Sequence, residues 1–143
     1  MMTDPAKESF EKMTGIVRRL TGDAAVDFEL VGIIRKELED KSDLWGSDRA
    51  YLSLTYMHLY HPSALVRHEA AFVVGESTPQ STFLDYSALH DPNPVVRHEA
   101  CLAMGHPSNR KASVYRWVLR YISEHDTDEM VRDSARVALK RIS

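Results

Sequence analysis

The sequence HPSALVRHEAAFVVG at residues 61–75 returns in closely similar form as DPNPVVRHEACLAMG at residues 91–105. A third and weaker copy, DTDEMVRDSARVALK, occupies residues 126–140. One valine, one arginine and one alanine keep their places in all three copies, whereas the His-Glu pair of the first two becomes Asp-Ser in the third. The copies begin 30 and 35 residues apart. Repeats of this length are typical of helical hairpins that bury their apolar faces only against neighbouring hairpins. The three copies therefore predict an all-α fold, an α-solenoid of HEAT-like hairpins.

Local signals place helix ends within each copy. Ser63, Asn93 and Thr127 are residue types that favour the N-cap position, and each stands directly before a periodic apolar run. Gly75 and Gly105 are predicted to end the helices of the first two copies as C-cap glycines. Each copy therefore predicts one helix.

Further helices are expected between and before the copies. No segment shows the two-residue alternation of a half-buried strand, so we predict no sheet. We predict eight helices as four antiparallel pairs. Those outside the copies are expected from Asp4 to about Gly22, from Ala24 to Asp40, and at residues 48–60, 78–89 and 109–124.

Length and composition describe one globular domain. The chain has 143 residues, 43% of them hydrophobic and 27% charged, which is ordinary for a globular protein and enough to bury a core. We assign a single domain to residues 1–143. Residues 1–45 are expected to form N-terminal capping helices, and residues 47–141 three repeats.

Charge and cysteine content exclude some classes of function. The formal net charge of −3 argues against a nucleic-acid binder, because neutralising phosphates requires a basic surface. Basic residues in the last third alternate with apolar ones at helical spacing and lie among acidic residues, as on a solvated helix face. The single Cys101 cannot form an internal disulfide, and no segment is apolar enough to span a membrane. We therefore expect a cytoplasmic protein without a membrane partner.

The duplicated His-Glu pair is the candidate for chemistry. His68 and Glu69 recur as His98 and Glu99, and equivalent positions in stacked repeats lie on the same face of successive helices. We therefore expect the four side chains to converge. Two imidazoles and two carboxylates suit iron, zinc or manganese, and two His with one carboxylate is the arrangement of O₂-activating non-haem Fe(II). The alternative is a pair that decorates a solvated helix turn.

Two observations favour the metal site over surface decoration. A helical wheel places His68 away from the core face, beside Leu65 and Phe72. In the third copy the pair is replaced by Asp133 and Ser134, which indicates that the fold does not require His-Glu.

The strings LVRHEAAFVVG and VVRHEACLAMG resemble the His-Glu repeats of deoxyhypusine hydroxylase. That family consists of HEAT-repeat di-iron monooxygenases that act on a modified lysine of a translation factor. Its four His-Glu motifs, two in each half of a pseudo-symmetric solenoid, hold two irons between the halves. The resemblance implies that His68, Glu69, His98 and Glu99 ligate iron. It covers residues 47–105 well, and the flanks match only as generic HEAT-like repeats of the PBS-lyase type.

The chain has half of the motifs and about half of the length expected of that family. A homodimer could rebuild the four-motif site, one chain could hold a single metal, or the metal chemistry could be lost. We favour the dimer, because two-fold pairing is the commonest symmetry. The family's substrate pocket is formed by both halves, so the resemblance does not identify the substrate.

Three functions compete. The leading hypothesis is an O₂-dependent di-iron hydroxylase that acts on a protein or peptide, and its main rival is a non-catalytic scaffold that binds a partner on its concave face. A third is a repeat protein of the lyase or chaperone type that serves bilin attachment. The remaining candidates for metal ligands are expected to be capping or solvated histidines and a small core cysteine: His61, His90, His106, His125 and Cys101.

Overall fold

The computed structural model describes residues 4–40, 44–77, 83–106 and 115–142. Within these ranges there are eight α-helices and no strand, so the all-α prediction is confirmed. A 3₁₀ turn, η1 (Ile16–Arg18), follows the first helix. The α-helices are α1 (Pro5–Thr14), α2 (Ala24–Asp40), α3 (Leu44–Tyr60), α4 (Ala64–Ser77), α5 (Leu84–His90), α6 (Pro94–Met104), α7 (Arg116–His125) and α8 (Glu129–Ile142).

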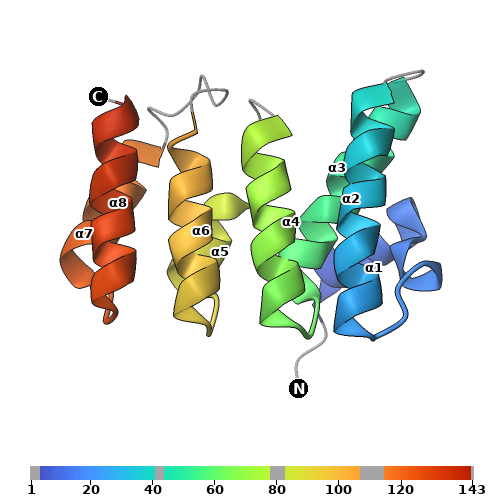
Figure 1. Ribbon diagram of the computed structural model, residues 1–143, viewed down its shortest axis with the longest axis horizontal. Helices are drawn as coiled ribbons and strands as arrows, with labels where there is room; N and C mark the ends of the chain where they lie inside the picture. Colours follow the sequence, from blue (N-terminus) through green and yellow to red (C-terminus); the bar gives the residue numbers. More distant parts are fainter. Residues whose placement is uncertain (1–3, 41–43, 78–82, 107–114, 143) are drawn as a thin grey trace.

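The helices lie in two layers (Figure 1). In the front layer α2, α4, α6 and α8 stand side by side in chain order, and α1, α3, α5 and α7 lie behind them. Neighbours within the front layer pack directly, α4 against α6 and α6 against α8, and each also packs on the back-layer helix that precedes it in the chain. Equivalent residues of the three sequence copies therefore lie on adjacent helices.

The positions shared by the copies form the core between the layers. Cys101 is also fully buried, as expected for a small core residue, and this burial raises the pKa of its thiol to about 12. The shared valines and alanines, all fully buried, are Val66, Val96, Val131, Ala70, Ala100 and Ala135.

Gly75 does not end its helix as predicted, because α4 continues to Ser77. It serves the close packing of α4 on α6: a Cβ atom at Gly75 would lie 2.5 Å from the Cβ and 2.7 Å from the Cα of Ala103. Gly105 is the C-cap of α6, as predicted, and approaches Ala138 of α8 in the same way, at 2.7 Å. Glycine at this repeat position therefore lets successive front-layer helices come together.

The helix starts agree with the predicted caps in two of three copies. The Asn93 Oδ1 atom accepts from the backbone N–H of Val95 at 2.8 Å, and the Ser63 Oγ accepts from that of Val66 at 3.5 Å. The cap of α8 is Asp128 rather than Thr127, because α8 begins one residue later than predicted.

The N-terminal helix is shorter than predicted. It ends at Thr14 instead of near Gly22, because Gly15 takes the left-handed φ of 64° and its N–H bonds back to the Glu11 carbonyl. Helix α3 begins at Leu44, earlier than the expected residue 48. The expected starts at residues 78 and 109 lie outside the described residues. No helix in the described ranges is long and apolar enough to cross a bilayer.

Candidate functional site

Arginine–aspartate pairs join each repeat to the next. The Arg67 Nε and Nη2 atoms donate to both oxygens of Asp91 at 2.9 and 3.1 Å, and Arg97 makes the same fork to Asp126 at 3.0 and 3.2 Å. All four side chains are largely buried. Each arginine also donates to a carbonyl in the turn before its own helix. Such bidentate pairs fix geometry as well as energy, so they hold the front-layer helices in register.

His68 makes a second bridge between α4 and α6. Its Nε2 atom lies 3.2 Å from the Oε2 atom of Glu99, and the two side chains are 28% and 11% exposed. The hydrogen bond to Glu99 raises the pKa of His68 above its ordinary value; partial burial opposes this shift, and the charges of Glu99 and Glu69 add to it. Two of the four predicted ligands are therefore in direct contact.

A third predicted ligand, Glu69, lines the same cleft. The cleft lies between α4 and α6, has a volume of about 420 Å³, and includes His68 and Glu99 in its wall. We call it the His-Glu cleft. It therefore combines two carboxylates and the imidazoles of His68 and His106 with an apolar wall. The other residues that line it are Phe72, Leu102, Ala103, His106 and Arg141.

The fourth predicted ligand, His98, does not line this cleft. Its Nδ1 atom is hydrogen-bonded to the Oγ of Ser134 on α8, and Ser134 holds the repeat position that Glu69 and Glu99 hold in the first two copies. The expected convergence of all four side chains is therefore not observed. The reason is directional: each histidine reaches forward to the next helix, so the two imidazoles lie between different helix pairs.

The tautomer of His98 follows from its partner. The Nδ1–H tautomer satisfies both contacts of Ser134: the hydroxyl donates to the carbonyl of Met130 at 2.8 Å, and its oxygen accepts from the Nδ1–H group of His98. In the neutral ring this leaves the lone pair on Nε2. A histidine that ligates a metal through one nitrogen commonly donates its other N–H to such an acceptor.

The donor types in the His-Glu cleft match what a metal requires. An imidazole with two carboxylates has the chemistry that iron, zinc and manganese accept. However, among the described residues no three His, Cys, Asp or Glu side chains are grouped closely enough to hold an ion. The described part of the chain therefore supplies suitable donor types but not an assembled ligand set.

A buried Asp–His pair was not predicted from the sequence. His61, expected to be a capping or solvated histidine, is only 2% exposed, and its Nε2 lies 2.7 Å from the Oδ2 of the fully buried Asp27. Its Nδ1 accepts the backbone N–H of Ser63, so Nε2 carries the proton and donates to Asp27. The signal in the sequence was an aspartate at helical spacing with the apolar Leu30, Val31 and Ile34. The pair joins α2 to the turn before α4, so it stabilises the packing of these two segments.

The comparisons with known proteins identify no relative. No family model matches the sequence, and neither a curated protein nor a solved structure matches it significantly. The resemblance to deoxyhypusine hydroxylase therefore rests on the His-Glu motifs alone.

His68 is expected to titrate above the ordinary histidine pKa of about 6.5, and Glu99→Gln is expected to lower its pKa. The Glu99 carboxylate stabilises the protonated ring of His68. The pair therefore contributes its full stabilisation when the pH lies below the pKa that His68 has in the unfolded chain. That stabilisation is lost as the pH rises through the higher folded-state pKa. Proton NMR of the imidazole ring measures the titration. The matched control is Glu124→Gln at an exposed carboxylate, which should leave His68 unchanged; a wild-type pKa at or below 6.5 would contradict the contact.

Proposed function

We propose that the chain is a HEAT-like repeat protein that binds a divalent metal through its His-Glu pairs, with iron as the metal and O₂-dependent hydroxylation as the activity. The observation that carries the proposal is the direct contact of His68 with Glu99 in an open cleft that Glu69 also lines. An exposed cleft gives a metal ion and a substrate access that a core pair would not have.

The fold supports the HEAT-like part of the proposal. Front-layer helices follow one another in chain order, and α4, α6 and α8 each pack on the back-layer helix before them, α3, α5 and α7. Antiparallel hairpins stacked into a short solenoid account for this contact pattern and for the sequence repeat.

The side chain of His98 supports a role in ligation. Its Nδ1–H is committed to Ser134, and its Nε2 is left with a lone pair, which is the state that a metal ligand needs. In this proposal His98 joins the ligand set when a metal and a second copy of the chain are present.

A second copy is proposed because the face around the pairs is apolar. Exposed or half-exposed apolar side chains lie one helical turn before and one turn after each His-Glu pair. Apolar side chains also occupy the equivalent positions on α8. Several exposed apolar side chains on one face favour an interaction surface. A two-fold dimer across this face would bring four His-Glu motifs together, as in the family that the motifs resemble. The flanking side chains are Leu65, Phe72, Val95, Leu102, Met130 and Val137.

The chemistry can be assigned only by class. Iron, when bound, would supply the activation of O₂, and His68, Glu69, His98 and Glu99 would hold it. Arg141 at the cleft wall adds a positive charge that would favour an acidic group on a protein or peptide substrate.

Metal analysis tests the proposal. We expect protein loaded anaerobically with Fe(II) and desalted to retain iron, and His68→Ala, His98→Ala and Glu99→Gln each to lower its affinity by about 100-fold or more, because they remove a ligand. Iron content is measured by ICP-MS, and Asp133→Ala, in the copy without the pair, is the control. Sedimentation of the loaded protein should give a dimer; a monomer that retains iron would favour a mononuclear site.

A non-catalytic scaffold is the second candidate, and one observation favours it. The His98 ring bonds the next front-layer helix, and Arg67 and Arg97 bond aspartates in the turns before the next front-layer helices. In this second interpretation the His-Glu positions join repeats and hold no metal. Wild-type iron content in all three ligand variants would support the scaffold and end the metal proposal.

A further inference from the structure

A pair of stacked or tilted rings recurs at the end of three back-layer helices. The sequence reads YMHLYHP at 56–62, YSALHDP at 86–92 and YISEHDT at 121–127, which are equivalent stretches of the three repeats. Ring centroids are 5.2 Å apart in the Tyr–Tyr pair ending α3, and 4.7 and 4.3 Å apart in the Tyr–His pairs ending α5 and α7. The pairs are Tyr56–Tyr60, Tyr86–His90 and Tyr121–His125.

Two grooves, which we call the edge grooves, lie between the three ring pairs. The first, of about 360 Å³, has Tyr60 on one side and Tyr86 with His90 on the other. The second, of about 410 Å³, has His90 on one side and Tyr121 with His125 on the other. Each residue that lines the first groove has its repeat equivalent in the second. Neither shares a lining residue with the His-Glu cleft.

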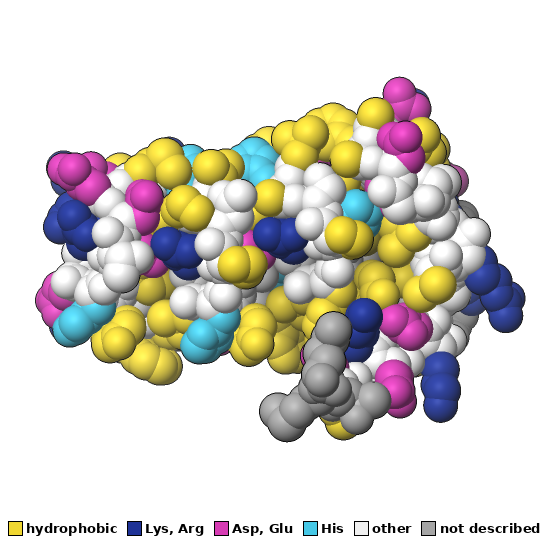
Figure 2. All heavy atoms as spheres, turned by 90° about the horizontal axis from the view of Figure 1, so that it is seen from below, with side chains coloured by type: hydrophobic (Ala, Val, Ile, Leu, Met, Phe, Trp, Pro, Cys, Tyr) yellow, Lys and Arg dark blue, Asp and Glu magenta, His cyan; other side chains and the backbone are white. Residues whose placement is uncertain are grey.

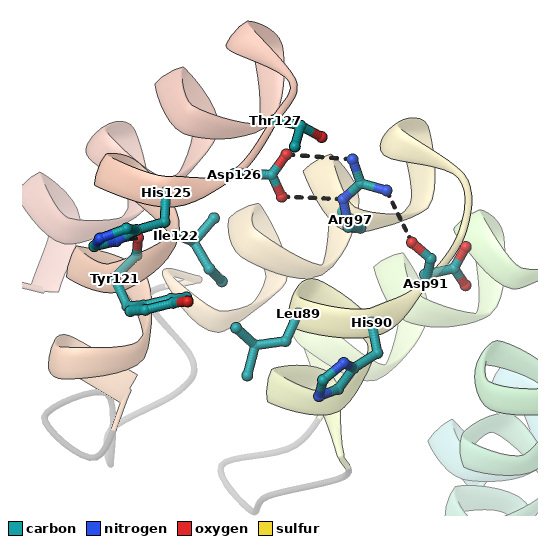
Figure 3. Close-up of a pocket in the computed structure, with 9 residues that line it drawn as sticks. All are labelled: Leu89, His90, Asp91, Arg97, Tyr121, Ile122, His125, Asp126 and Thr127. Atoms are coloured by element: carbon teal, nitrogen blue, oxygen red, sulfur yellow. Dashed lines mark hydrogen bonds and ion pairs between the residues drawn. The ribbon is translucent and has the colours of Figure 1, made fainter.

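The second edge groove shows how these sites are built (Figure 3). Tyr121 and His125 lie on one side and Leu89 and His90 on the other, with Arg97 beyond them, bonded to Asp126 and to the backbone of Asp91.

The grooves open onto one edge of the molecule. Tyr86 and Tyr121 are 57% and 52% exposed, whereas Tyr56 of the first pair is buried and donates to Glu11 of α1. Along one rim of the face in Figure 2, histidine and hydrophobic side chains alternate, with Lys or Arg side chains inward of them. The second and third ring pairs are therefore accessible to a ligand.

The charges on the groove floor argue against an anionic ligand. Arg67 and Arg97, the guanidinium groups that line the grooves, are each held in a bidentate pair with a carboxylate. Tyrosine and histidine rings also line both grooves, and their flat faces suit groups of the same shape, such as proline rings.

The spacing of the grooves selects the conformation of the ligand. Helices α4 and α6, which place Arg67 and Arg97 in the first and second groove, pack directly on each other. Packed helices are separated by about 8–10 Å, and the two grooves repeat at this spacing. A polyproline II helix advances about 3.1 Å per residue and presents the same face every three residues, about 9.3 Å. We propose that the edge grooves bind a proline-rich segment of another protein in this conformation, with prolines three residues apart seated in successive grooves.

Binding of two peptides of equal composition tests this proposal. The probes are fluorescein-labelled twelve-residue peptides of proline and alanine, one with prolines at every third position and one with the same prolines grouped at one end. Fluorescence polarisation should show saturable binding of the first and at least about tenfold weaker binding of the second. Tyr86→Ala and Tyr121→Ala should each weaken binding of the first by about tenfold, as for a central aromatic contact.

Trp117→Ala is the matched control, since Trp117 is a 70% exposed aromatic of α7 that lines neither groove. It should leave the affinity within about twofold, and circular dichroism should show that all variants keep their helices. Absence of saturable binding, equal binding of both peptides, or equal effects of Trp117→Ala and the tyrosine variants would each overturn the proposal.

Discussion

Asp27→Ala is expected to lower the free energy of unfolding by about 3–5 kcal/mol, because each buried donor that loses its acceptor costs about 1–3 kcal/mol. The Asp27 carboxylate is fully buried and accepts from the backbone and hydroxyl of Thr21, the backbone of Gly22 and the ring of His61. Removing it leaves all of these donors without their acceptor. Urea unfolding measures the loss. The control Asp23→Ala, at the exposed cap of α2, should cost only about 1 kcal/mol.

The same variant has a pH signature. Burial raises the pKa of Asp27, but the hydrogen bonds from His61, Thr21 and Gly22 outweigh it, so the pKa lies below its ordinary value of 3.8. A lowered folded-state pKa gives stability that is present above the unfolded-state pKa and is lost as the pH falls through the folded-state one. The difference between wild type and Asp27→Ala should therefore shrink below about pH 3.8. If the difference in unfolding free energy stays constant below pH 3.8, Asp27 does not have the lowered pKa described here.

Gly75→Ala is expected to destabilise the protein by about 1–3 kcal/mol, although alanine is the better helix former. The added Cβ would meet the Cα and Cβ of Ala103, which are backbone or rigidly attached to it and cannot turn aside. The α4 and α6 helices must then move apart. Thermal and urea unfolding measure the effect.

Gly32→Ala provides the opposite case on the same measurements. Gly32 lies inside α2, and no described atom outside its own helical turn comes within 4 Å of the place that a Cβ atom would take. Alanine there should therefore stabilise the protein by about 0.5–1 kcal/mol. The two substitutions are chemically identical and should differ in sign. Stabilisation by both would mean that α4 and α6 do not approach each other as described.

The sequence was sufficient to predict the helices and much of the core, because each repeat carries its own caps and apolar period. It was not sufficient for Gly75, which reads as a helix end. The alternative role, close contact with Ala103, depends on a helix from the next repeat. Helix ends are local properties of a sequence, whereas the distance between two helices is a property of the assembled fold.

The site was predicted less completely, for a related reason. Repeat spacing placed His68 and His98 on adjacent helices of one layer, which is observed, but could not give the direction in which each side chain extends. The Asp133-Ser134 copy was interpreted as evidence that the fold does without the pair. In the structure, Ser134 of that copy is hydrogen-bonded to His98, so the copy takes part in the same series of contacts between front-layer helices.

Titration of the purified protein with Co(II), followed by visible absorption, tests the metal site most directly, because cobalt replaces iron or zinc in His-carboxylate sites and its d–d bands report coordination by protein ligands. The proposal predicts bands that grow to saturation in the wild type and in Asp133→Ala, and that are absent at the same cobalt concentrations in His68→Ala and Glu99→Gln. A wild-type spectrum identical to that of cobalt in buffer, or bands that persist unchanged in both ligand variants, would contradict metal binding by the His-Glu pairs.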